Sequence, residues 1–183
     1  IKGSGIGQKI TDGITLTSSP TSIAEKPILP TDVDVYLDAT SGGLGTTKLT
    51  RAVKCNIKVS DRFGPVWVLN SANSSFVSTI ETEPKAEIKL MVEADSEGMG
   101  ILTAMRGTTT QFLSVKCTSQ DNAGTSGTNK YSFQWDAAVK VKDVSDFSDE
   151  DGIYAIEWTF DMVHDATWGK AMNVTAVNSI SAL

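Results

Sequence analysis

Apolar and polar side chains alternate through most of the chain from residue 33 onward. The longest alternating segment spans residues 130–142, and a return segment spans residues 153–163. Successive side chains of a β-strand point to opposite faces of the sheet, so this period of two predicts half-buried strands. Shorter or weaker segments predict further strands at residues 33–38, 49–60, 76–83, 87–94, 111–117 and 173–180.

One segment has helical spacing instead. Met99, Leu102 and Met105 recur every three residues, which places them on one face of a helix. Ser, Asp and Gly residues flank this segment and are common at helix ends. We therefore predict one helix over residues 97–106, with Asp95 or Ser96 as its N-cap and Gly107 ending it in a left-handed turn.

About eight strands and one helix predict an all-β protein, a β-sandwich or small barrel with the helix on its flank. The segment at residues 130–142 is longer than a usual strand of about six residues. Long strands have long edges, and exposed edges promote pairing between chains unless they are covered. The pattern therefore favours a protein that assembles through its strands.

Residues 1–31 differ from the rest of the chain. Four glycines precede residue 14, and Pro27 and Pro30 follow a polar stretch. Such a segment cannot build a core of its own. We expect an extended N-terminal arm over residues 1–31, ordered against a neighbour, and a β domain over residues 32–183.

The connection at residues 61–75 is longer than a hairpin turn requires. It carries Phe63 and Trp67, together with Arg62 and Pro65. A long loop with apolar side chains either packs on its own domain or docks into another one. Trp and Arg are typical interface hot spots, which favours docking, and packing on the same domain is the alternative.

The chain offers little for catalysis or metal binding. Its one histidine, His164, lies next to Asp165 in the sequence, but adjacency is not the geometry of a catalytic triad. Cys55 and Cys117 are too far apart for zinc-ligand spacing. Each lies on the apolar side of a strand, which favours two buried free thiols over a disulfide. We predict no catalytic residue, no cofactor and no metal site, and so not an enzyme.

An acidic segment at residues 145–152 follows the longest strand. It does not fit a helix–loop–helix calcium loop, because Phe147 and Trp158 would occupy ligand positions. A solvated turn is favoured, and an irregular calcium loop is the alternative. The net charge of −6 argues against binding nucleic acid through phosphate neutralisation. The apolar runs are too short to span a bilayer.

Several segments together resemble the major tail tube proteins of actinobacterial long-tailed bacteriophages. The resemblance covers most of residues 33–183, in the same order throughout. The segments are VDVYLDATSGGLGTTKLTR, DRFGPVWVLNSANSSF, ETEPKAEIKLMVEAD, FSDEDGIYAIEWTF and VHDATWGKAMNVTAVNSISAL.

The resemblance implies a phage tail tube fold, shared with the tubes of contractile tails and of type VI secretion systems. Six copies form a ring, and their inner sheets join edge to edge into one barrel around a lumen. Rings stack with help from a long loop and an N-terminal arm. The ring-stacking residues would be Arg62, Phe63, Pro65 and Trp67.

The function implied is a structural one: a tube in the virion tail, assembled in the host cytoplasm, through which the genome is delivered. The partners implied are copies of the chain itself and the tape measure, tail terminator and distal tail proteins. DNA would pass without specific binding, so we expect a net acidic or neutral lumen. Its candidate residues are Glu81, Glu83, Glu87 and Glu93.

Two other function classes compete with this interpretation. An adhesin-like or carbohydrate-binding β-sandwich would bind through exposed aromatic residues and would stay monomeric or trimeric. A small β-fold hydrolase is disfavoured by the residues available for chemistry.

Overall fold

The computed structural model describes Gly7, Gly13 and residues 28–60, 63–69, 75–82, 85–123 and 129–179. The chain divides into two compact units. The smaller consists of Ile1–Glu25 and Val59–Lys85, and the larger of Lys26–Lys58 and Ala86–Leu183. Most of the N-terminal arm expected at residues 1–31 lies outside the described residues.

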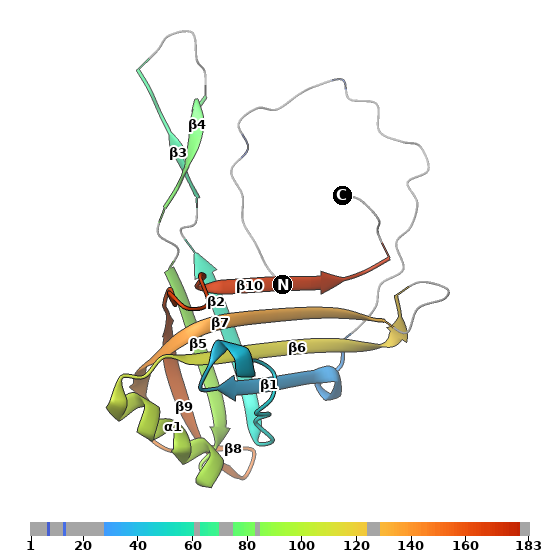
Figure 1. Ribbon diagram of the computed structural model, residues 1–183, viewed down its shortest axis with the longest axis vertical. Coiled ribbons are helices and arrows are strands. Elements are labelled where there is room, and N and C mark those ends of the chain that lie inside the picture. Colours follow the sequence, from blue (N-terminus) through green and yellow to red (C-terminus); the bar gives the residue numbers. More distant parts are fainter. Residues whose placement is uncertain are drawn as a thin grey trace. The chain divides into compact units, whose positions relative to one another are not determined.

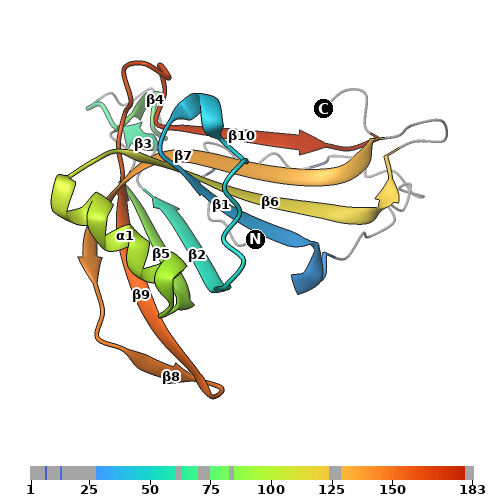
Figure 2. The same ribbon diagram turned by 60° about the horizontal axis from the view of Figure 1, so that its bottom comes forward.

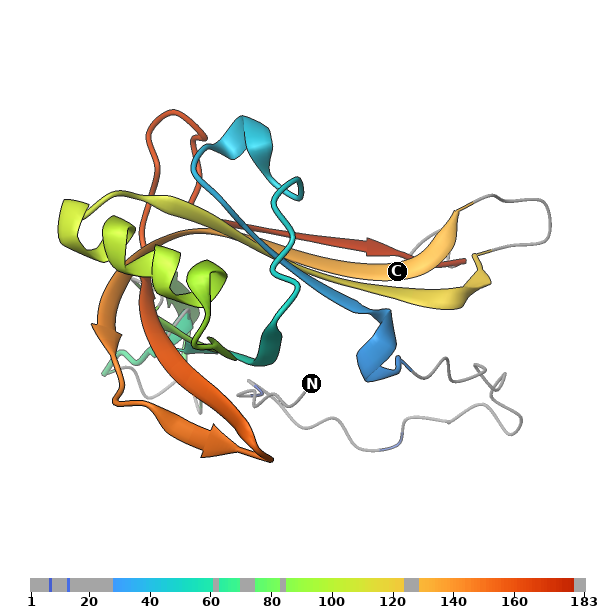
Figure 3. The same ribbon diagram turned by 90° about the horizontal axis from the view of Figure 1, so that it is seen from below.

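The larger unit is built on one sheet that folds over into two layers (Figures 1 and 3). One layer contains β1, β6, the first half of β7, and β10. The other contains the second half of β7, then β9, β5 and β2, with the short β8 beside β9. The strands are β1 (Val33–Asp38), β2 (Ala52–Ser60), β5 (Lys85–Glu93), β6 (Gln111–Asn122), β7 (Lys130–Val144), β8 (Ser148–Glu150), β9 (Ile153–Met162) and β10 (Met172–Val177).

Strand β7 belongs to both layers. Its first half pairs antiparallel with β10, from Val177↔Ser132 to Met172↔Ala137. Its second half pairs with β9, beginning at Val139↔Met162. The strand has 15 residues, so the long strand predicted at residues 130–142 is confirmed.

The hydrophobic core lies between the two layers. Trp158 and Phe160 of β9 are fully buried, as are Ile88 and Leu90 of β5 and Leu113 of β6. All five belong to one cluster of packed apolar side chains. These residues occupy every second position of their strands, as the period of two predicted.

Helix α1 (Ser96–Gly107) flanks this core near the second half of β7 (Figures 2 and 3). The helix predicted over residues 97–106 is therefore confirmed to within one residue at each end. Asp95 is the N-cap, because its Oδ1 accepts hydrogen bonds from the backbone N–H groups of Glu97 and Gly98, both at 2.9 Å.

The end of the helix differs from the prediction. Gly107 is its last residue, and the left-handed conformation belongs to Thr108, with φ 49°. The backbone N–H groups of Thr108 and Thr109 donate to the carbonyls of Met105 and Ala104, at 3.1 Å each. These bonds satisfy carbonyl groups of the last helical turn. The left-handed residue that ends the helix is thus one position later than predicted.

Two segments read as loops contain short strands. In the smaller unit, β3 (Phe63–Val66) pairs antiparallel with β4 (Ser78–Glu81). In the larger unit, the acidic segment forms β8 and a two-residue connection to β9 at Asp151 and Gly152, with φ values of 53° and 84°. Positive φ at both positions is typical of the type I′ turns that join tight hairpins. Among the described residues, no helix is long and apolar enough to cross a membrane.

Candidate assembly surfaces

The hairpin of β3 and β4 exposes unusually much apolar surface. Phe63 is 61% exposed, Trp67 66% and Leu69 109%. Trp67 meets Phe76 edge to face, with ring centroids 6.0 Å apart. The pairing extends to the residue before β4, because the Val77 N–H donates to the Val66 carbonyl at 3.0 Å. A cluster of exposed apolar side chains of this kind is typical of a surface that contacts another chain.

Three of the four residues predicted to stack rings lie on this hairpin. Phe63 and Pro65 belong to β3, and Trp67 follows it directly. Pro65 has no N–H to donate, which suits a strand at the edge of a sheet. Arg62 lies outside the described residues.

The larger unit has a charged sheet face turned away from its core. On β5, Glu87, Lys89 and Glu93 lie on this face, opposite the core residues of the strand, and Met91 on the same face is buried. Lys89 Nζ lies 3.1 Å from Glu157 Oε1 of β9, and this hydrogen bond raises the pKa of Lys89. Lysines on this face are thus partly offset by carboxylates of the neighbouring strand.

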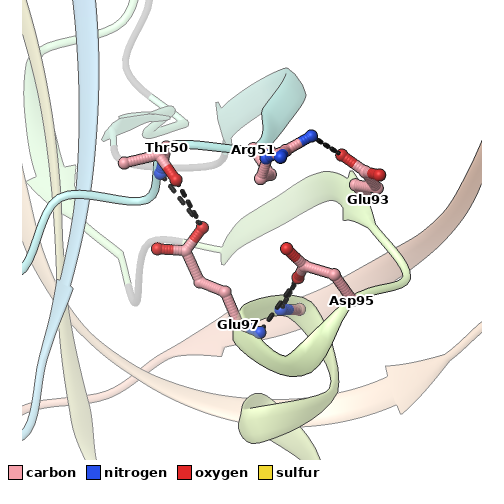
Figure 4. A network of polar contacts seen from close by, with 6 residues as sticks. Thr50, Arg51, Glu93, Asp95 and Glu97 are labelled. Atoms are coloured by element: carbon pink, nitrogen blue, oxygen red, sulfur yellow. Dashed lines mark hydrogen bonds and ion pairs between the residues drawn. The ribbon is translucent and has the colours of Figure 1, made fainter.

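Two further ion pairs lie near or on the same face. Lys142 Nζ of β7 lies 3.1 Å from Asp161 Oδ1 of β9. Arg51 Nη1, just before β2, lies 2.6 Å from Glu93 Oε2 (Figure 4). All of these groups are partly exposed, so each pair contributes little to stability, but each lowers the net charge that the face presents.

The four candidate lumen residues lie in different parts of the chain. Glu87 and Glu93 lie on the charged face of β5. Glu81 lies on β4 in the smaller unit, opposite Phe63 in the register. Glu83 lies outside the described residues. Sequence reasoning missed the lysines that share the face with Glu87 and Glu93, because only the strand order brings β5, β7 and β9 together.

A polar network ties the start of β2 to the start of α1 (Figure 4). The backbone N–H and the Oγ1 hydroxyl of Thr50 both donate to Glu97 Oε2, at 3.1 and 3.2 Å. Together with the Arg51–Glu93 pair, these bonds hold the chain entering β2 against the β5–α1 connection. Both carboxylates, of Glu93 and Glu97, accept hydrogen bonds from residues of the neighbouring segment. This arrangement indicates that the network has a structural role.

The edge strands of the sheet differ in whether their outer backbone groups are hydrogen-bonded. Strand β1 is covered on its outer side, because the Leu37 N–H donates to the Thr47 carbonyl and the Leu49 N–H to the Val35 carbonyl. Within the described residues, β2 pairs only with β5, β8 only with β9, and β10 only with β7. These three strands therefore present backbone groups on which another chain could pair.

The residues considered for chemistry have local roles. Asp165 Oδ1 accepts from the Trp168 N–H at 2.7 Å, so the segment after His164 is a tight turn. Both cysteines are free thiols, and burial, with a smaller contribution from nearby Cys117, raises the pKa of Cys55 to about 11. Across the described ranges, no group of three or more His, Cys, Asp or Glu side chains is placed to hold a metal ion.

No protein-family model and no curated protein sequence matches this chain. Among solved structures, it is similar to a chain of the SPP1 tail tube, determined by solid-state NMR and cryo-EM. The two share 11% sequence identity, with a TM-score of 0.54 over 84% of this chain and 82% of that chain. A crystal structure of Hcp protein also matches, with 8% identity and a TM-score of 0.41 over 79% of this chain and 98% of that chain, a score too low to show a shared fold. The β-rich chain, with its flanking helix, has the fold of the SPP1 tail tube.

Proposed function

We propose that this chain is a structural protein that polymerises as stacked six-membered rings into the tail tube of a long-tailed bacteriophage. The observation that carries the proposal is the tail tube fold, which extends over 84% of the chain. In this role the chain belongs to the virion tail, is assembled in the host cytoplasm, and forms the conduit for genome delivery. Its partners are its own copies and the tape measure, tail terminator and distal tail proteins.

The exposed hairpin supports stacking between rings. Phe63 and Trp67 present exposed apolar surface, and Pro65 between them is half-buried. Burying the exposed surface against a neighbouring ring removes it from water, and a large aromatic residue such as Trp67 is suited to dominate such a contact. Residues 1–31 are proposed to cross onto a neighbouring copy and to assist the same step.

The charged face of the larger unit supports a passage for DNA. Glu87 and Glu93 belong to this face, and the carboxylates of Glu157 and Asp161 offset Lys89 and Lys142. Lysines already paired with carboxylates release fewer counterions on meeting phosphate, so a passing duplex is retained less. We propose that this face lines the lumen.

Electron microscopy of the purified protein tests the proposal directly. We expect hollow tubes whose cross-sections show sixfold symmetry and whose length grows with protein concentration. A protein that stays monomeric at high concentration contradicts the proposal. Discrete particles that bind carbohydrate would instead identify the adhesin-like alternative.

A further inference from the structure

We propose that copies of this chain join by pairing the basic edge strand β2 of one copy with the acidic edge strand β8 of the next. This inference rests on the proposed polymer and names the two surfaces that hold neighbouring copies together. The partner of each edge is a second copy of the same chain.

Both strands lie at the margins of one layer. Within the described residues, the layer ends at β2 on one side and at β8, together with the second half of β7, on the other, and neither β2 nor β8 pairs with a further strand on its outer side (Figure 2). Pairing β8 of one copy with β2 of the next would therefore continue the layer from copy to copy. The two edges differ, so the contact is heterologous and repeats into a ring or a filament.

The two edges carry opposite charges. Strand β2 holds Lys54 and Lys58, and residues 48–60 contain no Asp or Glu. The β8–β9 hairpin holds Asp146, Asp149, Glu150 and Asp151, and residues 145–156 contain no Lys or Arg. All six side chains are exposed, and among the described residues none of them forms an ion pair within the chain.

The two edges also leave apolar side chains exposed on the interior side of the layer. Tyr154 is in step with the buried Trp158 of β9, yet it is 62% exposed and stacks on Phe147, with ring centroids 4.9 Å apart. Val53 of β2 is in step with Cys55, which packs against the core, yet it is 45% exposed. Pairing the edges would extend both interior faces and remove these side chains from water.

Charge reversal on each edge provides the test. One variant carries Lys54→Glu and Lys58→Glu, and the other carries Asp146→Lys, Glu150→Lys and Asp151→Asn. Asp149 is kept because its Oδ1 accepts from the Gly152 N–H at 2.9 Å, and Asp151 is changed to Asn because Asn also tolerates its positive φ of 53°. In each variant both edges then have the same sign of charge, and like charges on paired strands repel.

We expect each variant alone to need at least about a tenfold higher concentration to form tubes than the unchanged protein. An equimolar mixture should recover assembly, because copies of the two variants can alternate with opposite edges facing. The variant Lys116→Glu with Lys130→Glu makes the same change in net charge as the Lys54 and Lys58 variant, but away from both edges, and should assemble normally. Circular dichroism confirms that each variant is folded before assembly is scored.

A second experiment does not depend on the charge variants folding. Tubes are grown from a mixture of Val53→Cys and Phe147→Cys copies and treated with a bis-maleimide, with unchanged protein measuring the background from Cys55 and Cys117. We expect dimers that join one Val53→Cys copy to one Phe147→Cys copy, and none above background when Val174→Cys replaces Phe147→Cys. If tubes form without the expected dimers, or if each charge variant assembles alone, the pairing of β2 with β8 is wrong. The proposal that the chain forms a tube is not affected by either result. Unchanged protein that forms no tubes overturns the proposed function itself.

Discussion

A Cβ atom on Gly98 would lie 2.2 Å from the carbonyl oxygen of Glu93, so the first turn of α1 rests directly on the end of β5. The same Cβ would lie 2.8 Å from a methyl group of Val92. No side chain fits at position 98 without moving the helix off the strand. This contact fixes where the helix begins, next to the Asp95 cap.

Gly98→Ala should therefore lower the free energy of unfolding by about 1–3 kcal/mol, through overpacking against the backbone. Gly100→Ala is the matched control in the same helix, because nothing lies within 4 Å of a Cβ there. That change should stabilise the protein by up to about 1 kcal/mol, since alanine favours the helix. Urea unfolding measures both, and equal effects of the two substitutions would contradict the close approach.

Asp38 gives the protein a pH-dependent contribution to stability. It is only 4% exposed, and its carboxylate accepts from the N–H groups of Gly45 and Thr47 at 2.9 Å and from the Thr46 hydroxyl at 2.8 Å. Burial alone would raise the pKa of Asp38, but these hydrogen bonds outweigh burial and lower it. Because the pKa of Asp38 is lower in the folded state, its ionised form stabilises the protein at pH values above the unfolded pKa of about 3.9. This stabilisation is lost as the pH falls through the folded-state pKa.

Asp38→Asn should cost about 1–3 kcal/mol at pH 7, because charged hydrogen bonds become neutral ones. The gap between the unfolding free energies of the variant and the unchanged protein should narrow as the pH drops below about 4. Asp146→Asn, at an exposed position, should leave the pH profile unaltered. A gap that stays constant from pH 7 to pH 2 would mean that the carboxylate charge is not what holds residues 45–47.

Trp67→Ala tests the proposed stacking surface. The substitution should remove on the order of 2 kcal/mol or more from each contact between rings, so single rings or short stacks should replace long tubes. Val174→Ala, at another exposed apolar position, should not shorten the tubes. Tube lengths in electron micrographs are the measurement, and normal polymerisation of the Trp67 variant would exclude this role for the hairpin.

The paired lysines of the charged face predict how tubes treat DNA. Replacing Glu157→Gln and Asp161→Asn leaves Lys89 and Lys142 without their carboxylate partners. Tubes of this variant should retain DNA at low salt and release it as salt rises, whereas unchanged tubes should not retain it. Glu157→Asp with Asp161→Glu keeps both charges and is the control. Equal retention by all three would place this face away from the passage.

Alternation predicted the long strands well because large apolar side chains such as Trp135 of β7 and Trp158 of β9 recur at every second position on the core face. Alternation did not predict that Asp136 and Ala138, on the other face of β7, are buried as well. The sequence predicts a turn where β8 lies, because Ser148–Glu150 has no apolar alternation. The segment is a strand only through its pairing with β9. The Asp-Gly dipeptide at residues 151–152 was the available signal for a tight hairpin.

The candidate surfaces were harder to predict. Strand β3 contains Gly64 and Pro65, which are poor strand formers, so its pairing with β4 decides its structure. The period of two placed Tyr154 on the interior face but could not show that the core ends before reaching it. Burial at a sheet margin depends on which strands lie alongside, and strand order is a property of the whole fold.

The continuity of β7 has a mechanical consequence. One unbroken backbone runs through both layers, bonded to β10 in its first half and to β9 in its second. A force that drew the layers apart along β7 would load many of these hydrogen bonds at once in shear, instead of opening them one at a time like a zipper. The two layers are therefore mechanically coupled through β7, and a displacement of one layer is transmitted along this strand to the other.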